Sequence, residues 1–161
     1  MDMLEVIGRS LAIGIGATAL LDIWALFLNR AFGLPLANWA MVGRWFAYLP
    51  RGRFMHDTIA DTPPVSNELA IGWIMHYLVG ALFAGIVLLF WGLDWARNPT
   101  LLPALIVGVV TVGCGWFILQ PGMGFGLAAS KRPNANQVRL IGLINHVVFG
   151  LGLWLAALLM R

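Results

Sequence analysis

Two histidines in this sequence share a setting that suits the binding of a metal or a cofactor. Each lies at the centre of the pattern Gly-x3-His-x3-Gly. Residues spaced by four lie on one face of a helix, and glycines on that face let a second helix or a flat ligand approach the backbone. The histidines are His76 and His146, and their flanking glycines are Gly72, Gly80, Gly142 and Gly150.

An aspartate accompanies the two histidines. Asp22 belongs to a third face with the same spacing, which Gly14 and Thr18 complete. Each of the three side chains lies about eight residues from the end of its predicted helix, which corresponds to a depth of roughly 12 Å in the membrane. A carboxylate at this depth costs several kcal/mol unless it faces the protein interior and is paired. We therefore predict a polar layer of Asp22, His76 and His146. Its supporting side chains are Thr18, Asn145, Cys114 and Gln120.

Several functions are consistent with this layer. Two histidines and one carboxylate match the ligand set of divalent iron or zinc, and two histidines flanked by glycine suit a b-type haem. Binding of a metal ion or small cofactor is the preferred prediction, with redox or hydrolytic chemistry as an extension; whether the protein is an enzyme stays open. A histidine beside a carboxylate also suits a proton-coupled transporter of a small solute. A purely structural network and a non-catalytic accessory or assembly subunit are consistent with the same residues.

The elements that carry these residues are predicted to cross a membrane. Hydrophobic residues make up 60% of the chain and charged residues 11%, whereas a soluble domain has about 25% charged residues. A spanning helix needs about 20 apolar residues. Four segments qualify: about 6–29, 69–93, 100–120 and 138–160. We therefore predict one integral membrane domain over residues 1–161, folded as a four-helix transmembrane bundle of two consecutive hairpins.

The basic residues indicate an orientation for these spans. With four spans, both termini and the short 94–99 loop share one side, which holds Arg9, Arg97 and Arg161. The positive-inside rule places the other, more basic side in the cytoplasm. We expect a multi-pass protein of the bacterial inner membrane with both termini in the periplasm. The basic side holds Arg30, Arg44, Arg51, Arg53, Lys131, Arg132 and Arg139.

The two long loops carry further candidate sites. Residues 37–50 place apolar side chains on one face and predict an amphipathic helix in the membrane interface. Directly after it, a cluster of basic residues could contact an anion or a lipid headgroup, although plain positive-inside charge is the favoured explanation. In the second loop, Gly122, Gly124 and Gly126 alternate without a preceding strand, which favours a flexible or re-entrant turn over a dinucleotide site. The candidate anion contacts are Arg51, Arg53 and His56.

A stripe of small residues on the first span predicts self-association. Gly8, Ala12 and Gly16 are spaced by four, and small residues allow two helices to approach closely. We expect a homodimer through this stripe. The other expected partners are membrane lipids, and nucleic acid is not expected, because the basic residues flank membrane spans.

Four blocks of the sequence carry a resemblance to a known family. They read "GRWFAYLPRGRFMHDTI", "GWIMHYLVGALFA", "QPGMGFGLAASKRPN" and "HVVFGLGLW". These blocks resemble those of a bacterial family of small, four-span inner-membrane proteins that is filed as a domain of unknown function. The resemblance covers nearly the whole chain. It implies four spans and a bacterial inner membrane, and it implies no activity, substrate or cofactor.

Overall fold

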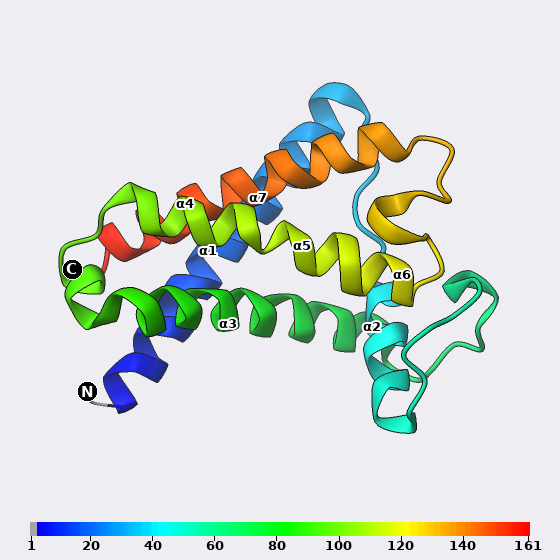
Figure 1. The fold of residues 1–161 in the computed structure, drawn as a ribbon, viewed down its shortest axis with the longest axis horizontal. Helices are drawn as coiled ribbons and strands as arrows, with labels where there is room; N and C mark the ends of the chain where they lie inside the picture. Colours follow the sequence, from blue (N-terminus) through cyan, green and yellow to red (C-terminus); the bar gives the residue numbers. More distant parts are fainter. Residues whose placement is uncertain (1–2) are drawn as a thin grey trace. The chain divides into compact units, whose positions relative to one another are not determined.

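The computed structural model describes residues 3–161, and within that range it contains helices and turns but no strand. Four helical stretches are long and apolar enough to cross a membrane (Figure 1). The predicted all-helical membrane fold is therefore confirmed, with ends that differ from the expected ones by a few residues. The stretches are α1 (Met3–Phe32), α3 (Glu68–Arg97), residues Leu101–Gly122 and α7 (Ala135–Leu158).

The third stretch is irregular, and a proline near its end accounts for its last interruption. It comprises α4 (Leu101–Val110), α5 (Val112–Cys114), a π-helical turn (Gly115–Leu119) and α6 (Gln120–Gly122). Proline has no backbone N–H, and its ring clashes with the carbonyl four residues earlier in a regular helix. Just before Pro121, the N–H of Gln120 donates to the carbonyl of Gly115, five residues back. The helix therefore widens at this point rather than ending.

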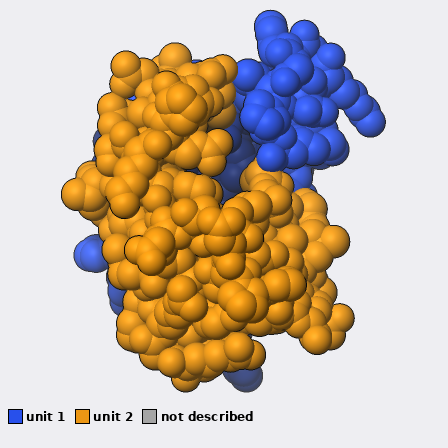
Figure 2. All heavy atoms as spheres, turned by 90° about the vertical axis from the view of Figure 1, so that its right-hand side faces the viewer, with its two compact units in different colours: residues 1–36, 77–111, 143–161 blue, residues 37–76, 112–142 orange. Residues whose placement is uncertain are grey.

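The chain divides into two compact units, which Figure 2 shows in different colours. Unit 1 comprises residues up to 36, 77–111 and 143–161, and unit 2 comprises residues 37–76 and 112–142.

Unit 1 is a bundle of helical segments from α1, α3, α4 and α7. Its core is apolar and includes Ala17 and Leu153, each 0% exposed. Glycines allow the helices to cross closely. A Cβ atom on Gly108 of α4 would lie 2.6 Å from the Cα of Gly150 of α7, so no larger residue fits at this crossing without displacing the backbone.

Unit 2 is built around α2 (Trp39–Tyr48), which confirms the helix predicted over residues 37–50. The side chain of Asn38 caps this helix by accepting a hydrogen bond from the N–H of Met41 at 3.2 Å. Three 3-10 turns, Leu49–Arg51, Ile59–Asp61 and Leu127–Ala129, shape the loops around it. The buried core of the unit consists of Val42, Trp45, Ile59 and Met123.

Candidate functional site

Two polar contacts join helices inside unit 1. The hydroxyl of Tyr77 donates to the carboxylate of Asp22 at 2.9 Å. The indole N–H of Trp24 donates to the side-chain oxygen of Asn145 at 3.1 Å. Each contact gives a polar group within an apolar helix a partner, which lowers its cost in the membrane. Tyr77 was not among the side chains that the sequence predicted beside Asp22.

His146 also contacts a neighbouring helix within unit 1. Its Nδ1 lies 2.9 Å from the carbonyl of Gly108, to which it donates, and 3.2 Å from the hydroxyl of Thr111. That hydroxyl itself donates to the carbonyls of Val107 and Gly108. His146 therefore links α7 to the end of α4.

His76 lies in unit 2, where it packs against aromatic rings. Its ring centroid is 3.9 Å from that of Trp39, and Trp73 contacts the same ring edge-on. No group of three His, Cys, Asp or Glu side chains within residues 3–161 is arranged to hold a metal ion. Binding of a metal or haem by Asp22, His76 and His146 stays a prediction.

The glycines that flank the histidines lie where neighbouring chain segments approach. A Cβ atom on Gly72 would meet the carbonyl of Trp39, and one on Gly80 would meet the hydroxyl of Thr18. In α7, a Cβ atom on Gly142 would lie 3.4 Å from the indole nitrogen of Trp116. A Cβ atom on Gly150 would lie 3.0 Å from the carbonyl oxygen of Ala104. These glycines therefore serve the packing of helices, one of the two roles that the pattern predicted.

The remaining members of the predicted layer have separate environments. Thr18 is buried and donates to the carbonyl of Gly14 at 2.8 Å. Cys114 is exposed. The side-chain oxygen of Gln120 and the indole nitrogen of Trp116 are buried without a hydrogen-bond partner in the described part of the chain.

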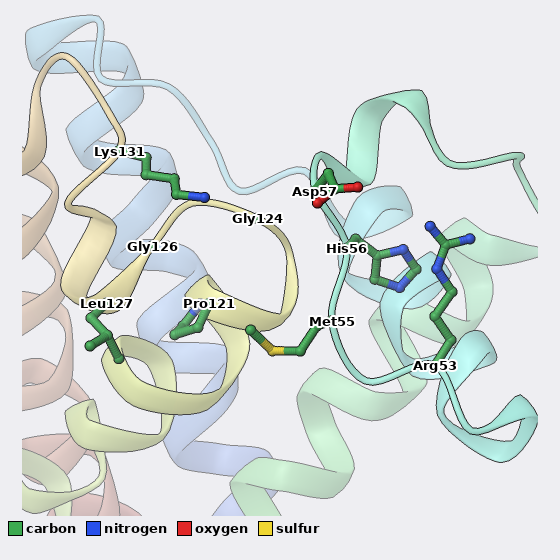
Figure 3. Close-up of a pocket in the computed structure, with 9 residues that line it drawn as sticks. All are labelled: Arg53, Met55, His56, Asp57, Pro121, Gly124, Gly126, Leu127 and Lys131. Carbon is green, nitrogen blue, oxygen red and sulfur yellow. The ribbon is translucent and has the colours of Figure 1, made fainter.

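A pocket in unit 2 lies between its two long loops (Figure 3). Its volume is about 390 Å³, which is within the range of small-molecule sites. The lining combines charged, apolar and glycine residues: Arg53, Met55, His56, Asp57, Pro121, Gly124, Gly126, Leu127 and Lys131.

Backbone hydrogen bonds hold the two loops together at this pocket. The N–H of His56 donates to the carbonyl of Gly122 at 2.9 Å, and the N–H of Ile59 donates to that of Met123 at 3.1 Å. Arg44 of α2 also stabilises the first loop. Its guanidinium donates to the carbonyls of Ile59, Ala60 and Thr62 at 3.1, 3.2 and 2.8 Å.

The alternating glycines of the second loop have a structural explanation. A Cβ atom on Gly122 would meet the ring of Trp45, and one on Gly124 would meet the backbone of His56 and Asp57. Gly124 also has a positive φ of 87°, which side chains disfavour. Gly122 and Gly124 therefore allow close contact with the first loop, whereas a Cβ atom on Gly126 would meet Ser130 and Lys131 of its own loop.

His56 is the most buried polar side chain that lines the pocket, with 5% of its surface exposed. Its Nδ1 lies 2.9 Å from the hydroxyl of Thr62, which donates to the carbonyl of Thr58 at 3.2 Å. Because that hydroxyl proton is already used, Nδ1 carries the proton of the imidazole and donates it to Thr62. The other ring nitrogen, Nε2, is buried without a hydrogen-bond partner in the described residues. Burial, and secondly the guanidinium of Arg53, lower the pKa of His56, while Asp57 opposes this shift.

The charges of the pocket come from both loops. In Figure 3 the Lys131 ammonium extends from the second loop, and the Asp57 carboxylate lies between it and the Arg53 guanidinium. The guanidinium of Arg53 lies 5.6 Å from the ring centroid of Tyr48. Of the three predicted anion contacts, Arg53 and His56 line the pocket. Arg51 does not line it; its guanidinium lies over the Tyr48 ring at 4.9 Å.

Asp57 and Lys131 are the charged residues that sequence reasoning missed. Both belong to the two long loops in which the sequence indicated further candidate sites, within "FMHDTIAD" and "GFGLAASKR". The positions of Asp57 and Lys131 in the sequence do not indicate that the two loops are in contact. That contact depends on glycines in the second loop, which leave room for the backbone of the first.

The fold and this pocket define a class: a multi-pass membrane protein with a helical bundle and a loop-built unit that holds a charged pocket. Residues 11–160 match the family model described as "Protein of unknown function (DUF2938)", and the chain belongs to that family. This match, which covers nearly the whole chain, confirms the predicted membership of a family of unknown function. No curated protein and no solved structure matches the chain.

Proposed function

We propose that unit 2 binds the phosphate-bearing headgroup of a membrane phospholipid. The observation that carries this proposal is the convergence of Arg53 and Lys131, from loops far apart in the sequence, on one pocket of about 390 Å³. Guanidinium and ammonium groups beside membrane spans are the side chains that bind lipid phosphates.

The apolar lining supports a lipid rather than a free anion. Met55 and Leu127 line the same pocket and are 63% and 61% exposed. Exposed apolar side chains next to cations match the boundary between a headgroup and its glycerol and acyl region. His56 adds no positive charge at neutral pH, because its pKa is lowered. Arg53 and Lys131 are therefore the groups that attract the phosphate.

The loop charges support a cytoplasmic location for this pocket. Seven basic residues fall on the side of the long loops and three on the side of the termini, which under the positive-inside rule places unit 2 at the inner leaflet. A reporter fused after Arg161 is then expected to behave as periplasmic. Cytoplasmic fluorescence from such a fusion would overturn this orientation.

Binding can be measured with short-chain, water-soluble phospholipids added to the protein in detergent. Tryptophan fluorescence provides the signal, because the ring of Trp45 packs against Gly122 beside the pocket. We expect Arg53→Gln and Lys131→Gln each to weaken binding about fivefold to tenfold, the loss of one charge-assisted hydrogen bond.

Neighbouring arginines offer matched controls. Arg51 stacks on Tyr48, and Arg132 lies over the ring of Phe125 at 4.8 Å; neither lines the pocket. Arg51→Gln and Arg132→Gln remove the same charge from the same loops and are expected to leave the affinity unchanged. Equal loss in all four variants would indicate general attraction to basic loops, and this result would contradict the proposed pocket. Inorganic phosphate and glycerol phosphate, titrated in parallel, test whether a free anion binds as tightly as the lipid.

A further inference from the structure

A second, smaller pocket adjoins the first and is lined by a different set of charged residues. It has a volume of about 240 Å³ and shares Arg53 and Asp57 with the larger pocket. Its remaining lining consists of Thr58, Asp61, Thr62 and Pro63. The two pockets together therefore form a continuous surface on the first loop of unit 2.

The two ends of this surface carry opposite charges. The larger pocket holds two cations, Arg53 and Lys131, and one carboxylate, Asp57. The smaller pocket holds one cation, Arg53, and the two carboxylates of Asp57 and Asp61. A purely anionic ligand would be repelled by the carboxylates, whereas a ligand with a positive and a negative group would be attracted at both ends.

Asp57 forms no ion pair with another described residue, although Arg53 and Lys131 line the same pocket. A carboxylate kept without an ion-pair partner beside a phosphate site favours a ligand that brings its own cation.

His56 supports the same ligand class. Its side chain lines the larger pocket, is 5% exposed and leaves Nε2 without a hydrogen-bond partner in the described residues. With the proton on Nδ1, Nε2 can only accept a hydrogen bond. An acceptor in the same pocket as the Asp57 carboxylate suits a group that donates several hydrogen bonds, as a primary ammonium does.

We infer that the ligand is a zwitterionic aminophosphate, the phosphoethanolamine headgroup of phosphatidylethanolamine. Its phosphate contacts Lys131 and Arg53, and its ammonium contacts Asp57 at the end towards Asp61. This inference rests on the proposed function, which requires only that a phosphate headgroup binds. A quaternary ammonium such as choline has no N–H to donate, and a glycerol headgroup has no positive charge, so both should bind more weakly.

The test compares three dihexanoyl phospholipids with ethanolamine, choline and glycerol headgroups, each titrated against the full-length protein in detergent. We expect wild type to bind the ethanolamine lipid about tenfold more tightly than either of the others, the effect of one charge-assisted contact. Asp57→Asn should abolish this preference and tighten binding of the glycerol lipid. Asp61→Asn should reduce the preference by a smaller factor.

A control and a second ligand complete the design. Asp94 is 98% exposed and lies outside both pockets, so Asp94→Asn should leave the preference intact. Glycerophosphoethanolamine, which lacks acyl chains, should compete for the same site more weakly than the lipid; tighter binding would overturn the lipid as the source of the headgroup. Binding of all three lipids with equal affinity, or a preference that survives Asp57→Asn, would overturn the inference alone. Failure of all three lipids to bind would overturn the proposed function itself.

Discussion

The guanidinium of Arg44 and the carboxylate of Glu68 form a two-pronged ion pair between α2 and the first turn of α3. Nε lies 2.8 Å from Oε2, and Nη2 lies 2.8 Å from Oε1. The side chains are only 12% and 16% exposed, so the pair is shielded from water. Because Nη1 of Arg44 also donates to loop carbonyls, one side chain connects α2, α3 and the loop that lines the pocket.

This pair leads to the first prediction. Arg44→Lys keeps the charge but cannot make two parallel hydrogen bonds and reach the carbonyls as well. We expect it to lower the stability of unit 2 by about 2 kcal/mol, measured as a lower midpoint of thermal unfolding in detergent. Arg9→Lys is the control, since Arg9 pairs with Glu5 of the same helix closer to solvent, where such pairs contribute little, and its hydrogen bond to the carbonyl of Met160 is exposed. A loss as large in Arg9→Lys would contradict this reasoning.

A second prediction concerns the crossing of α4 and α7. Gly108→Ala would place a methyl group 2.6 Å from the Cα of Gly150 and 2.7 Å from the carbonyl of His146. Such overpacking against backbone should cost about 1–3 kcal/mol and lower the unfolding midpoint. Gly113→Ala in the same predicted span meets only the ring of Phe117, at an ordinary 3.5 Å, and should be nearly neutral. Similar midpoints for the two variants would show that the crossing tolerates a side chain.

The third prediction separates two roles of His146. Because its Nδ1 already contacts Gly108 and Thr111, we expect His146→Ala to lower the unfolding midpoint without changing the metal or haem content of the purified protein. Elemental analysis and the absorbance near the Soret band provide the second measurement. Wild type could instead carry a metal or haem that both His76→Ala and His146→Ala lose. This result would show that the two histidines are ligands and would contradict a purely structural role for His146.

His56 gives a prediction about pH. Its pKa in the folded protein is lowered from 6.5, chiefly by burial, then by Arg53, with Asp57 opposing and the Tyr48 ring packed edge-on. Between the lowered pKa and 6.5 the unfolded chain binds a proton that the folded protein does not, so stability falls as pH decreases through this window.

The matched variant for this experiment is His56→Asn, whose amide can still donate to Thr62 but does not titrate. Unfolding midpoints measured between about pH 7.5 and pH 5.5 should decrease more steeply for wild type than for the variant. The comparison removes the contributions of His76 and His146, which are present in both proteins. Parallel curves would show that His56 binds its proton equally well in the folded state.

The last prediction tests the proposed homodimer through α1. Gly16 is a poor probe, because a Cβ atom there would lie 3.0 Å from that of Ala156 in the same bundle. Gly8 has no atom within 4 Å of such a Cβ, so Gly8→Leu changes the outer surface of the helix alone. We expect it to shift the protein from dimer to monomer in size-exclusion chromatography with light scattering, at an unchanged unfolding midpoint. An unchanged mass would exclude Gly8 from any interface.

The membrane class and the four spans could be predicted from the sequence, because long apolar segments have few alternatives to helices in a bilayer. The amphipathic period of residues 37–50 also predicted α2, and the basic cluster after it identified Arg53 and His56 as candidate ligand contacts. These features depend on composition and local spacing. They are therefore readable without knowledge of which segments meet.

Which residues became neighbours depended on how distant segments pack. Asp22 is hydrogen-bonded to Tyr77, and His146 to the carbonyl of Gly108. These pairs follow from where two helices cross, which depends on the side-chain volumes along both helices and not on the pattern of either one. The pocket arose in the same way. Lys131 and Asp57 line the same pocket because Gly122 and Gly124 leave room for the backbone of a loop more than sixty residues earlier in the chain.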